Sequence, residues 1–348
     1  DVREGRRDMG KVIHILARDG SPLGVTESSV SGEDGRNGVG GAELAILTLC
    51  RGWHLRGHDV TFYNNPVNGS SIFKQKSVSE FVPDEDRDIL IIFRSPNPLS
   101  YDAKGKKIWF SCDQYTIDSF ADFAGTVDEI VGISKFHSKY FETTYGIYNM
   151  RVIDIPVRDW EYSIDTPKVH NSCIFTSVPS RGVMELIPIW DRIVEQVPDA
   201  TLTITSDWSL WTGCDMSHAV SPFRVAWAGK KNVRYAGAVK RDELIKIQSS
   251  AEFHLYPCTY PELFCISVAE SQVAGAIPIT SSTGALSTTN RFGYRIRGTP
   301  TDSAFIDVFV NKAVELMKSD TFPDIQYQSK LEFGIESILD QWDEVFDG

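Results

Sequence analysis

Residues 261–280 have the sequence PELFCISVAESQVAGAIPIT, which contains the signals of a helix followed by a turn and an apolar strand. The helix is expected to begin near Phe264 and to end before Gly275. Glu262 then lies in the loop before the helix and Glu270 on its second turn, with the two carboxylates roughly 12 Å apart along the axis. Because the first N–H groups of a helix are unpaired, they favour an anion there. The alternative is that these glutamates are an ordinary loop residue and a solvated helix residue.

Length and composition indicate a globular chain with two domains. The sequence has 348 residues, of which 42% are hydrophobic and 24% charged, so each half can bury a core. The net charge of −12 argues against nucleic acid as a partner, although a nucleotide would need only a local cluster of donors. The six cysteines and seven histidines show no metal-binding spacing, and free thiols favour a cytoplasmic location. No run of about eighteen apolar residues predicts a transmembrane span; peripheral membrane contact and the oligomeric state stay open.

Strands and helices alternate along both halves of the chain, which predicts an α/β fold of two doubly wound, Rossmann-like domains. We expect the first domain to cover residues 1–160, the second 161–325, and a terminal helical segment 326–348. Open α/β sheets bind ligands at the carboxyl ends of their strands, so the cleft between the domains is the expected site. Strands are expected at 12–17, 59–63, 88–93, 107–110, 129–133, 151–157, 173–177, 201–205, 233–237, 253–257 and 277–280. Further helices are expected at 43–55, 182–197, 241–251, 302–319 and 328–346.

The segment that contains Glu262 and Glu270 resembles the E-x7-E region of the retaining glycosyltransferases of family 4, which have the GT-B fold. The commoner form of that region begins E-P-F-G-x-x-x-x-E, and Glu262, Phe264 and Glu270 match it. Leu263 stands where proline is usual and Cys265 where glycine is usual, and a cysteine there is similar to a subset of the family. The resemblance implies two domains that face a cleft, with the terminal helix packed back onto the first domain.

A glycine-rich segment precedes the first expected helix. It ends with the sequence GVGGAE, in which the adjacent Gly40 and Gly41 let the backbone approach a ligand closely at a helix start. The alternative is a flexible loop that uses its glycines for turns. Together with Arg56-Gly57-His58, the segment resembles the first-domain signature of the same family, which implies that the glycine loop lines the cleft.

Two further residues are candidates for the cleft. Arg181 follows an expected strand, and a guanidinium suits a phosphate; the alternative is a solvated turn residue. Many relatives have two cationic side chains here that contact the phosphates. The absence of one implies that another cation takes its place, with Lys240 or Arg241 as candidates. Asp113 ends another strand beside Cys112, which stands where many relatives have a histidine. Asp113 would hold a sugar hydroxyl, or it is simply a carboxylate at a strand end.

The resemblance implies transfer of a sugar from a nucleotide-diphosphate donor to a hydroxyl of a glycan or other acceptor. It further implies retention of configuration, and neither a metal nor another cofactor is expected. Two alternatives stay open: a GT-B nucleotide-sugar epimerase, and a non-catalytic relative that binds a nucleotide sugar or glycan. A nicotinamide oxidoreductase is disfavoured because neither half has G-x-G-x-x-G directly after a strand. The catalytic candidates are Glu262, Arg181 and Asp113, and the donor-binding candidates are Gly40, Gly41, Arg181, Phe264, Cys265, Ile266 and Glu270.

Overall fold

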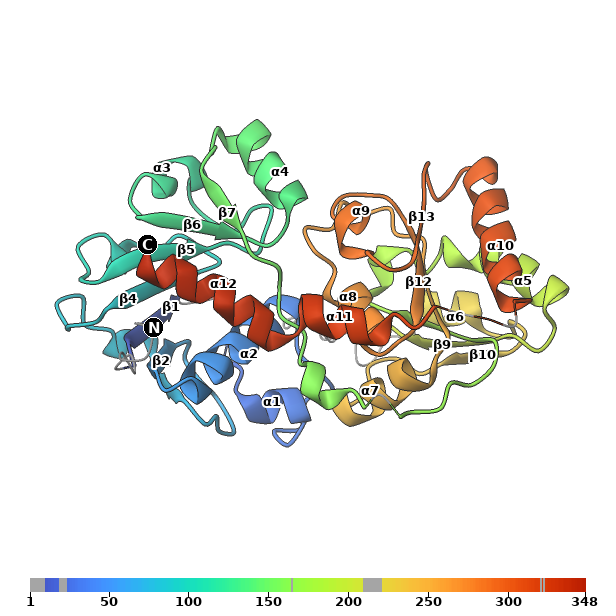
Figure 1. Cartoon of the computed structure of the whole chain (residues 1–348), viewed down its shortest axis with the longest axis horizontal. Coiled ribbons are helices and arrows are strands. Elements are labelled where there is room, and N and C mark those ends of the chain that lie inside the picture. The colour runs from blue at the N-terminus through green and yellow to red at the C-terminus, as the bar shows by residue number, and fades with distance from the viewer. Residues whose placement is uncertain (1–9, 19–23, 164, 209–220, 320, 322) are drawn as a thin grey trace, which may run out of the picture.

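The computed structural model describes residues 10–18, 24–163, 165–208, 221–319, 321 and 323–348. Two lobes, each built on one sheet, lie side by side along the long axis of the molecule (Figure 1). The strands of the N-terminal lobe are β1 (Val12–Ala17), β2 (Asp59–Tyr63), β3 (Lys74–Lys76), β4 (Ile89–Phe93), β5 (Lys106–Phe110), β6 (Glu129–Gly132) and β7 (Met150–Val152). Those of the C-terminal lobe are β8 (Ser172–Thr176), β9 (Thr201–Thr205), β10 (Val233–Tyr235), β11 (Phe253–Tyr256), β12 (Ile277–Ser281) and β13 (Tyr294–Ile296).

Both sheets are parallel. In each, the strand that comes first in the sequence lies inside the sheet, and the later strands are added first on one side of it and then on the other. The strand order is β3-β2-β1-β4-β5-β6-β7 in the first sheet and β10-β9-β8-β11-β12-β13 in the second. Every residue of β4, β11 and β12 is buried, as expected for strands covered by helices on both faces. The prediction of two doubly wound α/β domains is therefore confirmed.

The helices lie on both faces of the two sheets (Figure 1). The N-terminal lobe contains α1 (Glu27–Ser31), α2 (Gly41–Leu55), α3 (Phe120–Ala124) and α4 (Lys135–Tyr145). The C-terminal lobe contains α5 (Leu186–Gln196), α6 (Pro222–Trp227), α7 (Arg241–Ser250), α8 (Ile266–Val273), α9 (Leu286–Thr289) and α10 (Ser303–Met317). Two terminal helices follow, α11 (Gln326–Phe333) and α12 (Ile335–Asp347). Within the described residues we find no helix with the length and apolar character that a membrane span requires.

The terminal helices cross from the second lobe to the first, so that α12 lies along α2 (Figure 1). The ring of Trp342 meets that of Trp53 edge to face at 5.3 Å, and Asp343 pairs with Arg56 at 2.6 Å. This confirms the expected return of the chain to the first domain. The single helix expected at 328–346 is wrong, because Gly334 has an extended conformation (ψ 154°) that separates α11 from α12.

Several expected boundaries need correction. The strand expected at 151–157 is limited to β7, and Val157 instead donates its N–H to the carbonyl of Phe333 at 2.7 Å, where the two crossing segments meet. The strands β3 and β13 and the short helices α1, α3, α6 and α9 were not expected from the sequence. The domain boundary between residues 160 and 161 stays a prediction.

Candidate functional site

A cavity of about 330 Å³ lies between the lobes at the carboxyl ends of the strands. Its walls come from the glycine loop, the ends of β5, β8 and β9, and the start of α8, which is the position expected for a ligand site in open α/β sheets. Every residue that the sequence indicated as a catalytic or donor-binding candidate lines it, namely Gly40, Gly41, Asp113, Arg181, Glu262, Phe264, Cys265, Ile266 and Glu270, whereas Lys240, offered as a further cation, does not. The structure thus brings these residues together around one cavity, while their individual roles stay predictions.

The helix α8 begins at Ile266, two residues later than expected, and Cys265 is its N-cap. Cys265 has φ +75°, in the left-handed region that glycine adopts without strain, which accounts for the glycine in the commoner form of the motif. Among the described residues, the N–H groups of Phe264, Cys265 and Ile266 have no hydrogen-bond acceptor. Burial raises the pKa of the Cys265 thiol to about 12, so it is neutral at pH 7. The start of α8 therefore offers the cavity unpaired donors.

The backbone at Cys265 leads to a prediction about stability. We expect Cys265→Gly to change the free energy of unfolding by less than about 1 kcal/mol, because relief of the left-handed conformation offsets the lost burial of the thiol. Cys265→Val should destabilise the protein by about 1–3 kcal/mol, since a β-branched residue is poorly accommodated at positive φ. Chemical denaturation of both variants measures the two changes. A valine variant as stable as the wild type would contradict the prediction.

Glu262 and Arg181 form an ion pair on the cavity wall. The Nε atom of Arg181 lies 3.2 Å from Oε1 of Glu262, and the hydroxyl of Tyr256 donates to the same oxygen at 2.9 Å. The Arg181 guanidinium also stacks on the ring of Tyr260, 3.4 Å from its centroid. Burial raises the pKa of the Glu262 carboxyl, while Arg181 and the Tyr256 hydroxyl act in the opposite direction.

The turn after β8 depends on glycine. Gly182 has φ +110°, and a β-carbon there would lie 2.5 Å from the carbonyl oxygen of Pro257. No other residue fits this backbone without displacing the loop after β11. The Arg181-Gly182 pair noted in the sequence is therefore a guanidinium on a turn that only glycine can close, pressed against the segment that leads to Glu262.

Glu270 lies on the second turn of α8, lines the cavity and is almost completely buried, with 3% of its surface exposed. Its Oε1 atom lies 2.7 Å from Nη1 of Arg241, and its Oε2 atom accepts a hydrogen bond from Gln248 at 3.3 Å. The sequence suggested Arg241 as a second cation for phosphate, but its guanidinium forms ion pairs with Glu270 and Glu161. The sequence contained one indication of these ion pairs: an arginine at the first position of α7 is unfavourable at the positive end of the helix dipole, so an acidic partner is expected there.

Asp113 is held by Arg94, which was not among the residues expected at the site. Arg94 donates to both carboxylate oxygens of Asp113, at 2.7 and 2.9 Å, and its Nη1 atom donates to Glu43 at 3.0 Å. Glu43 is the acidic residue of the glycine-loop signature, so this part of the signature ties α2 to the end of β4. Cys112 lies beside Asp113 on the cavity wall, and burial raises the pKa of its thiol. The expected contact of Asp113 with a sugar stays a prediction.

The two lobes approach each other closely at the glycine loop. A β-carbon added at Gly41 would lie 3.1 Å from Cγ2 of Ile266, across the cleft. The first turn of α2 and the first turn of α8 thus meet at the cavity, one from each lobe. Within the part of the chain that the structure describes, no group of three or more histidine, cysteine, aspartate or glutamate residues is placed to hold a metal ion.

Comparison with known proteins identifies the fold. No family model matches the sequence, and no curated protein matches it. A glycosyltransferase from Rickettsia africae ESF-5 superposes with a TM-score of 0.69 at 13% identity, over 97% of this chain and 98% of that one. A sucrose-phosphate synthase from Thermosynechococcus elongatus gives 0.65 at 14% identity, over 97% and 98%. HepE from Anabaena in complex with UDP-glucose gives 0.67 at 14% identity, over 97% and 99%. The chain therefore has the GT-B fold of these glycosyltransferases.

Proposed function

We propose that the protein is a glycosyltransferase that moves a sugar from a nucleotide-diphosphate donor to a hydroxyl of a glycan or other acceptor. The observation that carries the proposal is the cavity between the lobes, in which Glu262 and Glu270 lie on either side of the unpaired N–H groups at the start of α8. This arrangement offers an anion site flanked by two carboxylates that can accept hydrogen bonds from hydroxyl groups. The solved structure of HepE with UDP-glucose, which has the same fold, supports a nucleotide sugar as the donor class.

In this proposal the difficult step is departure of the nucleotide while positive charge grows at the anomeric carbon. Arg181 and the N–H groups of Phe264, Cys265 and Ile266 stabilise the charge on the leaving diphosphate, in the manner of an oxyanion hole. To do so, Arg181 must shift part of its contact from Glu262 to the phosphate. Retention of configuration, with the leaving phosphate as the base, is part of the proposal on the family resemblance alone.

The carboxylates bind the two ends of the donor. Glu270 accepts hydrogen bonds from the ribose hydroxyls, because an ionised carboxylate has acceptor capacity beyond its contacts with Arg241 and Gln248. Glu262 accepts hydrogen bonds from hydroxyl groups of the transferred sugar and lies near the anomeric carbon, on which positive charge develops. Closure of the lobes over the donor would exclude water and limit hydrolysis.

Thermal unfolding in the presence of UDP-, GDP-, ADP- and dTDP-sugars tests the proposed donor class. A true donor at one hundred times its Kd should stabilise the protein by about 2.7 kcal/mol, which is a readily measured rise in Tm. Product analysis with the stabilising donor alone then separates the alternatives. An epimerised sugar would indicate the epimerase, and binding without nucleotide release under any acceptor would indicate a non-catalytic relative. No stabilisation by any nucleotide sugar would contradict the proposal.

Turnover is expected to be independent of divalent metal. The positive charge that neutralises the leaving diphosphate is supplied here by Arg181 and the start of α8, so we expect EDTA to change kcat by less than about twofold. The measurement is nucleotide release with and without EDTA, followed by added Mg²⁺ or Mn²⁺. A large loss that either metal restores would show that the charge is supplied differently.

A further inference from the structure

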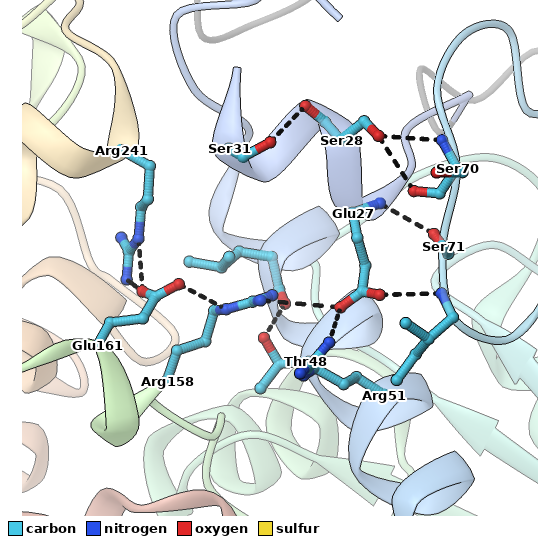
Figure 2. Close-up of polar contacts among 12 residues, drawn as sticks. Glu27, Ser28, Ser31, Thr48, Arg51, Ser70, Ser71, Arg158, Glu161 and Arg241 are labelled. Atoms are coloured by element: carbon cyan, nitrogen blue, oxygen red, sulfur yellow. Dashed lines mark hydrogen bonds and ion pairs between the residues drawn. The ribbon is translucent and has the colours of Figure 1, made fainter. Parts of the chain in front are cut away.

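Behind Glu270, ion pairs of alternating sign lead from the cavity into the N-terminal lobe. The charged chain consists of Glu270, Arg241, Glu161, Arg158, Glu27 and Arg51. Oε2 of Glu161 accepts from Nε and Nη2 of Arg241 at 2.8 and 2.7 Å, and its Oε1 accepts from Nε of Arg158 at 2.9 Å. Glu27 then lies 3.8 Å from Arg158 and 3.1 Å from Arg51 (Figure 2).

The charged chain joins three parts of the fold. Arg241 is the first residue of α7 in the C-terminal lobe, and Glu161 belongs to the 3₁₀ turn Asp159–Glu161 in the segment that connects the two sheets. Glu27 and Arg51 lie on α1 and α2 of the N-terminal lobe. Figure 2 shows the series from Arg241 to Arg51, with Glu161 between the guanidinium groups of Arg241 and Arg158.

Glu161 determines how the Arg241 guanidinium is oriented. It accepts from the Nε and Nη2 edge of the group, with the Tyr162 hydroxyl a second, longer acceptor for Nη2 at 3.4 Å, and this leaves Nη1 for the ion pair with Oε1 of Glu270 at 2.7 Å. The planar guanidinium holds this arrangement because its donors lie in a fixed fork. Arg241 is 8% exposed, so its charge needs carboxylate partners on both sides.

We infer that Glu161, acting through Arg241, is a positioning residue that orients the Glu270 carboxylate toward the two ribose hydroxyls of the donor nucleotide. The inference rests on the proposed function. Glu161 does not line the cavity, whereas Arg241 and Glu270 do, so any effect of Glu161 on ribose recognition must pass through Arg241. The contact of Gln248 with Oε2 holds the other side of the same carboxylate.

The test compares binding of UDP and 2′-deoxy-UDP by calorimetry. The wild-type protein should prefer UDP by about tenfold, because the deoxy compound lacks one hydrogen bond to a charged acceptor. In Glu161→Gln the preference should fall to about twofold or less, with a raised donor KM and a kcat within about threefold of the wild type, since the lost interaction is one of ground-state binding. Glu161→Asp should recover part of the preference. If the wild-type protein binds GDP or ADP instead of UDP, the same comparison is made between that nucleotide and its 2′-deoxy analogue.

A matched control breaks another ion pair of the connecting segment. Asp154 pairs with Arg291 of the C-terminal lobe, and neither residue lines the cavity. Asp154→Asn should lower Tm while it leaves the ribose preference unchanged. If Glu161→Gln does not fold, Arg241→Lys replaces it, because lysine keeps the charge but loses the fork and should lose the preference in the same way.

The outcomes separate the inference from the function on which it rests. A folded Glu161→Gln variant, or Arg241→Lys in its place, that keeps the tenfold preference would overturn the inference alone, and so would an equal loss in Asp154→Asn. A wild-type protein that binds none of these nucleotides would overturn the proposed function and the inference with it. Loss of the preference in Glu161→Gln, with the control unaffected, is the supporting result.

Discussion

Replacing Arg181 with alanine is expected to lower kcat by about 100- to 1,000-fold, the usual cost of removing one donor that stabilises developing negative charge. The guanidinium lies on the turn that Gly182 closes, stacks on Tyr260 and pairs with Glu262, so it is held in place before a donor arrives. Its removal also leaves Glu262 without its cationic partner in the cavity, which should lower Tm as well.

Single-turnover release of nucleotide, normalised to the folded fraction, measures the chemical step in Arg181→Ala apart from the change in stability. Arg181→Lys should retain more activity, because a point charge replaces the fork without restoring its geometry. Arg192→Ala is a suitable control: this arginine lies on α5 and forms an exposed pair with Asp307, 2.7 Å away. Turnover close to that of the wild type in Arg181→Ala would remove the residue from the proposed mechanism.

Replacing Glu270 with alanine is expected to weaken nucleotide binding by about 100-fold or more. Two hydrogen bonds from ribose hydroxyls to a buried carboxylate are lost together, and each is worth about 1.5 kcal/mol or more. The Arg241 guanidinium would in addition face the cavity with one carboxylate fewer. The effect should appear in Kd for the nucleotide, and inorganic pyrophosphate should bind as it does to the wild type.

Calorimetric titration of Glu270→Ala with UDP and with pyrophosphate checks this expectation. Glu270→Gln should lose less affinity, because the amide keeps one oxygen acceptor. Glu315→Ala removes an exposed carboxylate from α10 of the same lobe and should leave both affinities unchanged. Unchanged nucleotide affinity in a folded Glu270→Ala variant would contradict the assignment of the ribose to this residue.

The sequence predicted every strand that is buried along its whole length, and the strands that it missed, β3 and β13, are short and lie at sheet edges. The strands β4 and β12 are buried along their whole length and appear as hydrophobic runs. By contrast, β3 has the sequence KQK and β13 the sequence YRI, because they lie at sheet edges and pair on one side. Short edge strands of this kind have no hydrophobic pattern from which they can be predicted. The separation of α11 from α12 was missed because the helical periodicity continues across Gly334.

The candidate site was predictable only where the chemistry is local in sequence. Glu262, Phe264 and Glu270 form one motif, and all of them line the cavity. Arg94 and Arg241 were missed or misjudged because their partners are distant in sequence: Arg94 binds Asp113 from the neighbouring strand, and Arg241 is fixed by a turn in the connecting segment. Such pairings depend on the packing of elements, which no local pattern encodes.

The return of α12 to the N-terminal lobe has a consequence for biosynthesis. Trp53 is buried beneath Trp342 and Phe346, which are translated only after every strand of the second lobe. Domains generally fold in the order in which the ribosome releases them, but here the lobe that emerges first lacks its aromatic cover until the second lobe has left the exit tunnel. We therefore expect the nascent first lobe to stay incompletely folded and accessible to chaperones, and to complete its folding after the second lobe.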